Sequence, residues 1–354
     1  ANPATRETAW DSGKPKRGGN PTTNMAETIR IGVAGLTHGH VWGLIESFRK
    51  LPGAQMAAVA DATPLLDRAE GFDRKYTGWR EMLDKEQLDA LVVTSDNVES
   101  AEIAVQALGK GIPCLVEKAM AANAKDADRM LAAAKASGKT LMINWPFAWS
   151  ASLAHAITSA KSGEVGDVFY LRYRNGHKGP KEIGCDEWFV GWLYDESKNG
   201  GGSIADFGSY GAVLARVLLG MPESVFCFRG NLTKDYDVCD DHAVILLKYP
   251  KAHVFLESTW ATEGGDASAN PVISGTNGTL AVTGDKVLKG SGWGESAELT
   301  VPALPTSSPA EYFWECIQTG KTPEGLLSPE LSADACRILD AAIRSSASGK
   351  AEAP

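Results

Sequence analysis

The sequence predicts an N-terminal α/β domain on a doubly wound parallel sheet and a C-terminal α+β domain on a mostly antiparallel open sheet. Two observations carry this prediction. From residue 28 to residue 144, short apolar runs alternate with helical patterns, which is typical of a doubly wound parallel sheet. After residue 144, strand-like runs follow one another and Asn277-Gly278 supplies a hairpin turn, which favours an antiparallel sheet.

Each expected element follows from the spacing of its apolar residues. Strands are short apolar runs closed by polar or turn residues, and helices repeat apolar residues every three to four positions. In the first domain we expect strands over 29–34, 55–60, 90–94, 112–117 and 140–144, and helices over 41–51, 101–108 and 124–136. In the second we expect a helix over 152–162, strands over 168–174, 225–230, 242–249, 253–260, 272–274 and 279–282, and helical structure over 309–348.

The composition excludes several classes of function. The chain has 354 residues, a formal net charge of −9 and no long basic run, so neither nucleic acid nor an acidic membrane surface is an expected partner. No apolar stretch reaches the roughly 18–20 residues of a membrane helix. The scattered cysteines favour reduced thiols and therefore a cytoplasmic location, or a periplasmic one if a signal peptide was removed. The six cysteines form no C-x-x-C pair, and no metal site is predicted.

The turn after the first expected strand is rich in glycine and histidine. Glycines between a strand and a helix let backbone N–H groups approach a pyrophosphate, and an acid ending the next strand can hold a ribose diol. A carboxylate would repel a 2′-phosphate, so NAD is expected as the cofactor and NADP is disfavoured. A plain tight turn is the alternative. The candidate residues are Gly32, Gly35, Thr37, His38, Gly39, His40 and Asp61.

A charged pair, Glu117-Lys118, ends the strand expected over 112–117. In a parallel sheet, ligands bind just beyond the carboxyl ends of the strands, so this pair points to a cleft. A lysine in a partly dry cleft needs partners, and its pKa shifts readily. The alternative is an ion pair that merely closes the strand.

A glycine-rich segment, Gly200-Gly-Gly-Ser-Ile-Ala-Asp-Phe-Gly-Ser-Tyr210, interrupts the second domain. Its three consecutive glycines bring the backbone close to another part of the chain, and Ser203 is expected to cap the helix that follows. Asp206 and Tyr210 are four residues apart, so one helical face presents both. Alternatively, Asp206 only complements the helix dipole and Tyr210 only packs.

These three segments, in this order, resemble the Gfo/Idh/MocA oxidoreductase family over nearly the whole chain from Ile29. The resemblance implies that Lys118 lies beside the nicotinamide and that the second domain supplies the acid/base residue through Asp206 and Tyr210. It also places Asn97 on the asparagine of a T-P-N turn and Asn144 at the domain junction. A tyrosine at position 210 is similar to the glucose–fructose oxidoreductase and dihydrodiol or xylose dehydrogenase branch. Departures from the family motifs are Thr37, His40, Asp96, Ser100 and Ala119.

The expected activity is hydride transfer between nicotinamide and a hydroxyl carbon of a sugar, sugar derivative or polyol. Such a reaction needs a base for the hydroxyl proton, and a nearby ammonium favours the phenolate of a tyrosine. Tyr210 is therefore the expected acid/base, assisted by Lys118, with Asp206 orienting the substrate or the lysine. Ser95, Asn97, Glu117, Lys118 and Asn144 complete the expected cofactor site. Substrate contacts are expected from His177, Lys181, Trp192, Asp206 and Tyr210, although His177, Lys178 and Lys181 could equally form a solvated loop.

Two other functions stay open. One is an NAD-dependent glycosidase that oxidises a sugar transiently, eliminates the glycosidic substituent and keeps its cofactor bound. The other is a non-enzymatic dinucleotide or sugar sensor, which should tolerate loss of Lys118 and Tyr210. The expected parts of the chain are a flexible arm or cloning remnant (1–24), a dinucleotide-binding Rossmann domain (25–144) and a substrate-binding domain (145–354). The open sheet of the last part is expected to form a homodimer or homotetramer.

Overall fold

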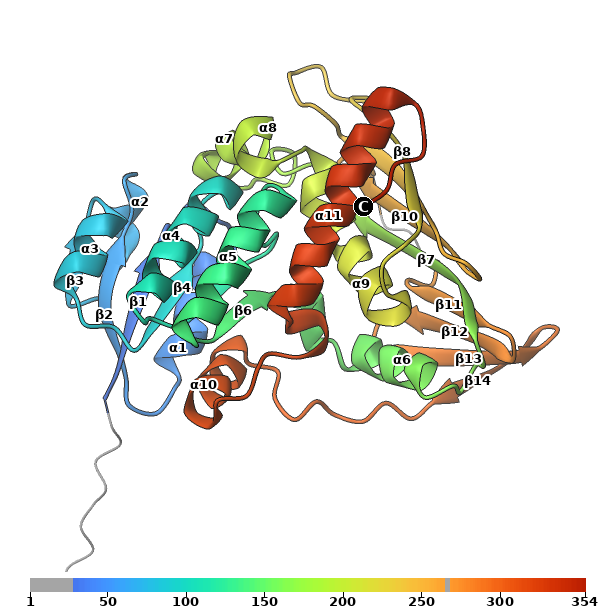
Figure 1. Ribbon diagram of the computed structural model, residues 1–354, viewed down its shortest axis with the longest axis horizontal. Helices are drawn as coiled ribbons and strands as arrows, with labels where there is room; N and C mark the ends of the chain where they lie inside the picture. The colour runs from blue at the N-terminus through green and yellow to red at the C-terminus, as the bar shows by residue number, and fades with distance from the viewer. Residues whose placement is uncertain (1–27, 265–267) are drawn as a thin grey trace, which may run out of the picture.

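The computed structural model describes residues 28–264 and 268–354, so the arm expected over 1–24 lies outside the described residues. Two β-sheets lie side by side along the long axis of the molecule, each with helices packed on it (Figure 1). The first is a six-stranded parallel sheet and the second an eight-stranded mixed sheet. Both predicted sheet types are therefore confirmed.

The strands of the parallel sheet lie in the order β3-β2-β1-β4-β5-β6. Strands β2 and β3 extend the sheet on one side of β1, and β4, β5 and β6 extend it on the other side. Helices α4 and α5 lie side by side on one face (Figure 1). Helix α1 packs against α10, which lies far from it in the sequence. The strands are β1 (Ile29–Ala34), β2 (Ala54–Ala60), β3 (Arg74–Tyr76), β4 (Ala90–Val93), β5 (Cys114–Glu117) and β6 (Leu141–Asn144). The helices are α1 (Val41–Arg49), α2 (Leu65–Arg68), α3 (Trp79–Lys85), α4 (Asn97–Gly109) and α5 (Ala124–Ser137).

Helix α4 begins four residues earlier than the sequence analysis expects. Asp96 is its N-cap, and the carboxylate accepts a hydrogen bond of 2.8 Å from the backbone N–H of Glu99. This cap satisfies a donor that a helix start otherwise leaves unpaired. Asp96, which replaces a proline of the family turn, therefore starts α4 directly at the edge of the sheet.

The second sheet has the order β14-β13-β12-β11-β7-β10-β9-β8 and is antiparallel except where β7 pairs with β10. Its outer hairpin, β13 and β14, was not expected because its residues are mostly polar, charged or glycine. The strands are β7 (Val168–Gly176), β8 (Ser224–Gly230), β9 (His242–Lys248), β10 (His253–Thr259), β11 (Val272–Gly275), β12 (Gly278–Thr283), β13 (Lys286–Gly292) and β14 (Glu295–Leu299).

The last helix connects the two sheets. This helix, α11, packs against α5 of the N-terminal part and against α9 and β8 of the C-terminal part. Figure 1 shows it running between the two parts. The helices of this part are α6 (Ala151–Lys161), α7 (Glu187–Leu193), α8 (Glu196–Asn199), α9 (Ser209–Leu219), α10 (Pro309–Thr319) and α11 (Pro329–Ser348). No helix among the described residues is long and apolar enough to cross a membrane.

Candidate active site

The predicted site residues of the parallel sheet come together at the carboxyl ends of its strands. The turn after β1, Asp61 after β2, Ser95–Asn97 after β4, the end of β5 and the end of β6 all lie at this edge. Because the strand order reverses between the neighbouring strands β1 and β4, this edge is the topological switch point where doubly wound sheets bind ligands.

The turn after β1 is closely packed. Gly35 has φ +85°, and a Cβ added there would lie 2.6 Å from the backbone nitrogen of Ser95, so only glycine fits. Asp61 accepts hydrogen bonds from the backbone N–H of Leu36 at 2.6 Å and of Thr63 at 2.7 Å. The acid at the end of β2 therefore fixes the glycine turn.

Lys118, Asp206 and Tyr210 form one buried cluster that joins the two sheets. The Nζ atom of Lys118 lies 2.5 Å from Oδ1 of Asp206 and 5.2 Å from the ring centroid of Tyr210. The peptide bond from Lys118 to Ala119 is cis. Asp206 also accepts a 3.1 Å hydrogen bond from Nε1 of Trp260. The structure thus brings together the three residues that the sequence analysis expects to carry out proton transfer.

The charges in this cluster oppose and balance one another. Burial disfavours the Lys118 ammonium, but Asp206, Tyr210 and Glu117 together outweigh burial and raise the pKa of Lys118 above its ordinary value. Burial likewise opposes ionisation of Asp206, yet Lys118 lowers its pKa. At neutral pH the pair is therefore an ammonium and a carboxylate, and Lys118 is a hydrogen-bond donor and not a base.

Burial and Lys118 act on the pKa of Tyr210 in opposite directions. Burial raises the pKa of Tyr210 to about 12, although the nearby Lys118 acts in the opposite direction. Trp145 and Phe147 pack edge-on against its ring, with centroids 5.1 and 4.9 Å away. These apolar neighbours remove water from the phenol, so the lysine only partly compensates for desolvation.

Ser203 does not cap the following helix. Its hydroxyl donates instead to Oδ1 of Asp240 at 2.8 Å, and residues Ile204–Gly208 form a π-helical turn before α9. The same carboxylate accepts from the backbone N–H groups of Gly202 at 3.0 Å and Ile204 at 2.8 Å. Asp240, which the sequence analysis missed, therefore holds the segment that carries Asp206.

The close approach expected of the three glycines is confirmed. A Cβ on Gly200 would lie 2.1 Å from the carbonyl oxygen of Ala122, and one on Gly202 would lie 2.1 Å from that of Asp240. Gly200 also has φ +85°. The glycines thus let this segment pass directly beside the parallel sheet and beside the strand that begins at His242.

Replacing Asp240 with alanine is expected to lower the free energy of unfolding by about 3–5 kcal/mol, because a fully buried carboxylate bonded to Arg229 is lost. Two backbone N–H groups and the Ser203 hydroxyl would also lose their acceptor. Denaturant unfolding measures the change. Asp237→Ala, an exposed carboxylate of the same loop, is the matched control, and equal stability of both variants would contradict the role of Asp240.

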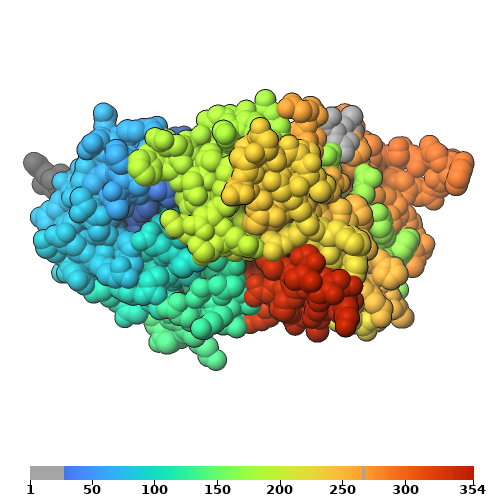
Figure 2. Space-filling model, turned by 90° about the horizontal axis from the view of Figure 1, so that it is seen from above, coloured from blue at the N-terminus to red at the C-terminus, as the bar shows by residue number. Residues whose placement is uncertain are grey.

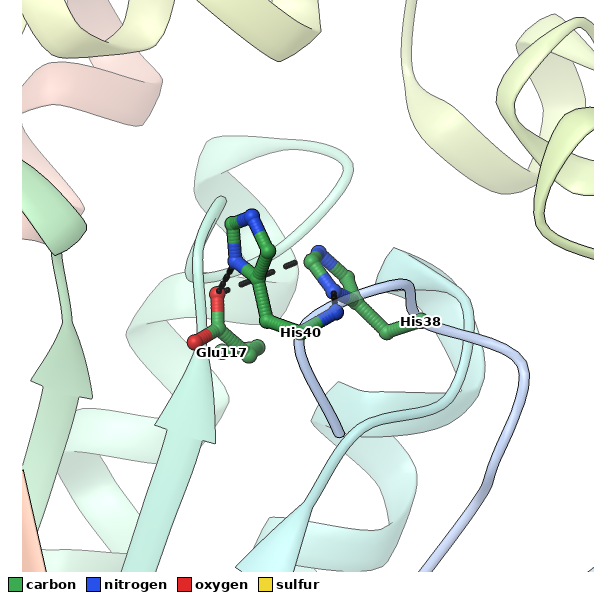
Figure 3. A group of neighbouring side chains, drawn as sticks. All are labelled: His38, His40 and Glu117. Carbon is green, nitrogen blue, oxygen red and sulfur yellow. Dashed lines mark hydrogen bonds and ion pairs between the residues drawn. The ribbon is translucent and has the colours of Figure 1, made fainter. Parts of the chain in front are cut away.

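Glu117 belongs to a second cluster with His38 and His40, and Figure 3 shows these three side chains next to one another. Its Oε2 atom lies 3.1 Å from Nδ1 of His40 and accepts from the backbone N–H of Lys118 at 3.1 Å. Oε1 accepts from the side-chain amide of Asn144. Burial opposes ionisation, but His40, His38 and Asn144 together lower the pKa of Glu117 to about 2.

His38 is buried and lies beneath a helix of the second part. Its ring centroid lies 4.9 Å from that of Phe189 and 5.8 Å from that of Trp192, both on α7. Figure 2 shows the yellow-green segment that contains α7 against the blue surface of the N-terminal part. Burial lowers the pKa of His38 to about 3, so its imidazole is neutral. Its Nε2 atom has no hydrogen-bond partner among the described residues.

The polar residues after β4 contact other residues of the site. Asn97 donates from its amide to the backbone and side-chain oxygens of Asn199 at 3.0 and 2.9 Å. Ser95 donates to Glu99. Asn199, a further residue that the sequence analysis missed, thereby ties the end of α8 to the sheet edge.

The candidate substrate residues occupy different environments. The ring of His177 packs at 4.9 Å against that of Phe207, and burial lowers its pKa. Lys181 is exposed, with its ammonium 4.6 Å from the ring centroid of Tyr236. Trp192 is buried, and its Nε1 atom lacks a partner among the described residues. His177 and Trp192 therefore lie close to the Lys118 cluster, whereas Lys181 lies in the outer loop.

Cavity size alone would place the site elsewhere. A cavity of about 840 Å³ lies between α6 and α10, lined by Trp149 and Tyr312 among others. A smaller one, of about 390 Å³, opens beside His40, Glu117 and Asn144. We assign the site to the sheet edge because the buried Lys118–Asp206 pair and the strand ends are there, whereas the Lys321–Glu324 pair that lines the larger cavity is exposed.

Two family models match the chain. One, described as an oxidoreductase family with an NAD-binding Rossmann fold, matches residues 29–145. The other, described as a GFO/IDH/MocA C-terminal domain, matches residues 154–281. The chain belongs to the Gfo/Idh/MocA family. Its N-terminal part is accordingly an NAD-binding Rossmann domain, as the resemblance implied.

Individual curated proteins also match this chain, at low sequence identity. The D-xylose 1-dehydrogenase (NADP(+)) 2 of Haloferax volcanii is 25% identical over 84% of this chain and 88% of its own length. A glycosyl hydrolase family 109 protein of Porphyromonas gingivalis is 28% identical over 27% of this chain and 23% of its own length. The chain spans less than half the length of several of these relatives, 23% for the glycosyl hydrolase family 109 protein and 42% for a levoglucosan dehydrogenase of Pseudarthrobacter phenanthrenivorans.

A solved structure shares the whole architecture. The aldose–aldose oxidoreductase of Caulobacter crescentus superposes with a TM-score of 0.77 over 93% of this chain and all of its own, at 21% identity. At this identity the likeness concerns the fold.

Proposed function

We propose that the protein is an NAD(P)-dependent dehydrogenase of a sugar, sugar derivative or polyol, with NAD preferred. The observation that carries this proposal is the buried Lys118–Asp206 pair, at 2.5 Å, beside Tyr210. It joins a residue ending β5 of an NAD-binding domain to the glycine-rich segment of the second part. A positioned donor and a phenol at a cofactor edge are what oxidation of an alcohol requires.

The residues at the sheet edge fit a dinucleotide. Gly35 leaves a space that a Cβ would fill, and the short approach to Ser95 keeps backbone N–H groups near the start of α1. Asp61 stands where a ribose diol is bound in such sheets. We propose that Gly32, Gly35, Thr37, His38, Gly39, His40, Asp61, Ser95, Asn97, Glu117, Lys118 and Asn144 hold the cofactor.

Bound NAD(P) supplies the hydride acceptor, and the protein handles the proton. In this mechanism Tyr210 Oη accepts the proton of the substrate hydroxyl, and the Lys118 ammonium stabilises the phenolate that is needed for this step. Asp206 keeps Lys118 charged and in place, and Trp260 orients Asp206 by donating to its other oxygen. We propose that His177 and Trp192 contact the ring of a sugar and that the exposed Lys181 contacts a larger substrate.

An NAD-dependent glycosidase is the second candidate, favoured by the match to the glycosyl hydrolase family 109 protein. Such an enzyme uses the same proton-transfer residues but restores its cofactor in each cycle. The two candidates therefore differ in net redox change and not in the residues of the site.

One experiment separates the two candidates. The purified protein is denatured and the supernatant is analysed for NAD(H) and NADP(H). The native protein is then supplied with each cofactor and a panel of aldoses, polyols, anhydrosugars and glycosides. Accumulation of reduced cofactor with a free sugar supports the dehydrogenase. Glycoside cleavage without accumulation supports the glycosidase, and failure to bind either dinucleotide contradicts both.

In this proposal the chain is divided into two domains, each built on one of the two sheets. Residues 25–144 carry the cofactor, and residues 145–354 supply the substrate side of the site. Helix α10 belongs spatially to the first part, because Phe313 packs into the core formed by β1 and α1. The C-terminal part therefore contributes to the packing of both.

We further propose that two copies of the chain associate through the outer face of the second sheet, either as a homodimer or within a homotetramer. This face exposes apolar side chains of neighbouring strands: Phe228 on β8 is 66% exposed and Leu246 on β9 is 41% exposed. Contiguous exposed apolar residues mark interaction surfaces.

Phe228→Glu is expected to shift the protein from dimer to monomer, because a charge would be buried at the interface. Sedimentation velocity at several concentrations measures the change. Leu232→Glu, an equally exposed loop position, serves as the control. A wild-type protein that is monomeric at high concentration would contradict the proposed interface.

A further inference from the structure

Three potential metal ligands converge beside the cofactor turn, although the sequence analysis predicted no metal site. One ring nitrogen of His38, one ring nitrogen of His40 and a carboxylate oxygen of Glu117 all lie within 4.8 Å of one another. Figure 3 shows both imidazoles directed at the same carboxylate oxygen. The distances to Oε2 of Glu117 are 3.9 Å from His38 and 3.1 Å from His40.

The donor set suits a first-row transition metal. Two imidazoles and one carboxylate bind Zn²⁺, Co²⁺ and related ions, whereas Mg²⁺ and Ca²⁺ prefer oxygen ligands. With metal–ligand bonds of about 2.0–2.2 Å, tetrahedral donors lie roughly 3.3–3.6 Å apart. The three atoms therefore need to contract by no more than about 1.5 Å to share an ion.

Two of the three donors are already held in place. His38 is packed between Phe189 and Trp192, and Glu117 is held by Asn144 and by the backbone of Lys118. A ligand carboxylate bonded to a neighbouring amide is the usual outer-shell support of a metal site. The buried Nε2 atom of His38 has no hydrogen-bond partner among the described residues and lies 3.9 Å from Oε2 of Glu117.

His40 is the ligand that can move. Its side chain is 43% exposed and borders the cavity of about 390 Å³, which leaves room for water at the remaining positions of the ion. The backbone N–H of His40 donates to Nδ1 of His38 at 3.2 Å, so the ring proton of His38 is on Nε2. Coordination through Nε2 moves that proton to Nδ1, so the turn at His40 must shift and the hydrogen bond must break.

We propose that His38, His40 and Glu117 form a binding site for a divalent transition-metal ion, such as Zn²⁺ or Co²⁺, and that this ion and the dinucleotide exclude each other. The exclusion rests on the proposed cofactor site, because the same turn and the same glutamate would be used by both ligands. The metal site itself depends only on the three side chains. Free transition metal would then control how much of the protein can bind its cofactor.

Cobalt binding tests the site without any activity assay. Protein without a polyhistidine tag, freed of cofactor and treated with a chelator, is titrated with Co²⁺ while its visible ligand-field absorption is recorded. We expect one equivalent to bind, and we expect Zn²⁺ to displace it. His40→Ala is expected to weaken binding at least tenfold, and Glu117→Gln more strongly. His155→Ala, a histidine on α6, should bind Co²⁺ like the wild type.

The outcomes are distinct. Absence of a cobalt spectrum, or equal affinity of wild type and His40→Ala, would overturn the metal site. Circular dichroism checks that Glu117→Gln is folded, and His40→Ala keeps the test decisive if it is not. Adding NADH to the cobalt-loaded protein should release the ion and abolish the absorption. Simultaneous binding of both ligands would overturn the exclusion, and failure of NADH to bind the metal-free protein would contradict the proposed cofactor site instead.

Discussion

Lys118→Met is expected to reduce kcat/KM for sugar oxidation by about a thousandfold. The substitution removes the ammonium that stabilises the Tyr210 phenolate, and positioned proton-transfer groups contribute about 10²–10⁴ in rate. Methionine keeps the length and apolar part of the side chain, so packing against Phe207 and Tyr210 is largely preserved. Steady-state kinetics with a substrate from the sugar panel measures the loss.

A second effect of this substitution must be separated from catalysis. It leaves the Asp206 carboxylate buried without its ammonium partner and with the indole N–H of Trp260 still donating to it, which is expected to destabilise the protein by about 3–5 kcal/mol. The double variant Lys118→Met/Asp206→Asn removes both charges and should recover most of this stability but not the activity. Lys110→Met, which changes an exposed lysine, is the control. Turnover of Lys118→Met within a few-fold of wild type would contradict the mechanism.

Tyr210→Phe is expected to lower kcat by about 10²–10⁴ while the dissociation constant for NAD stays near the wild-type value. Phenylalanine retains the edge-on packing against Trp145 and Phe147 and removes only the hydroxyl. Kinetics and fluorescence titration with NADH measure the two quantities. A parallel loss of cofactor affinity would indicate a structural role, and undiminished turnover would assign the proton to another group.

The pH dependence provides an independent signature of Tyr210. Burial raises its pKa to about 12, so the reactive phenolate is a minor species at neutral pH and increases about tenfold for each unit of pH. In the oxidation direction kcat/KM should therefore rise through the neutral and mildly alkaline range without levelling. A plateau near neutral pH would contradict Tyr210 as the base in the free enzyme, and Tyr210→Phe should abolish the rise.

Much of the fold could be predicted because its central strands are buried on both faces. The apolar runs that became β4 and, up to Glu117, β5 have no other stable environment in a protein of this size. The hairpin of β13 and β14 lacks this signal, since its residues are largely exposed and polar. Helices α7 and α8 are short and start at Asp186 and Asp195, whose capping role becomes visible only when the backbone is known.

The site was predictable where one short segment carries the information. Lys118 follows a recognisable strand, and Asp206 follows three glycines, so their proximity could be expected. Asp240 could not be found in this way, because it is remote in sequence from the segment it holds. The elevated pKa of Tyr210 depends on burial by Trp145 and Phe147, which sequence spacing does not disclose.

Transfer of deuterium tests the central claim most directly. Protein loaded with NAD is mixed with sugars, polyols and glycosides deuterated at their hydroxyl-bearing carbons, quenched within one turnover, and the cofactor is analysed by mass spectrometry. The account predicts deuterium in the reduced nicotinamide for at least one compound, and none with Tyr210→Phe. Tight cofactor binding without deuterium transfer from any member of the panel would contradict it.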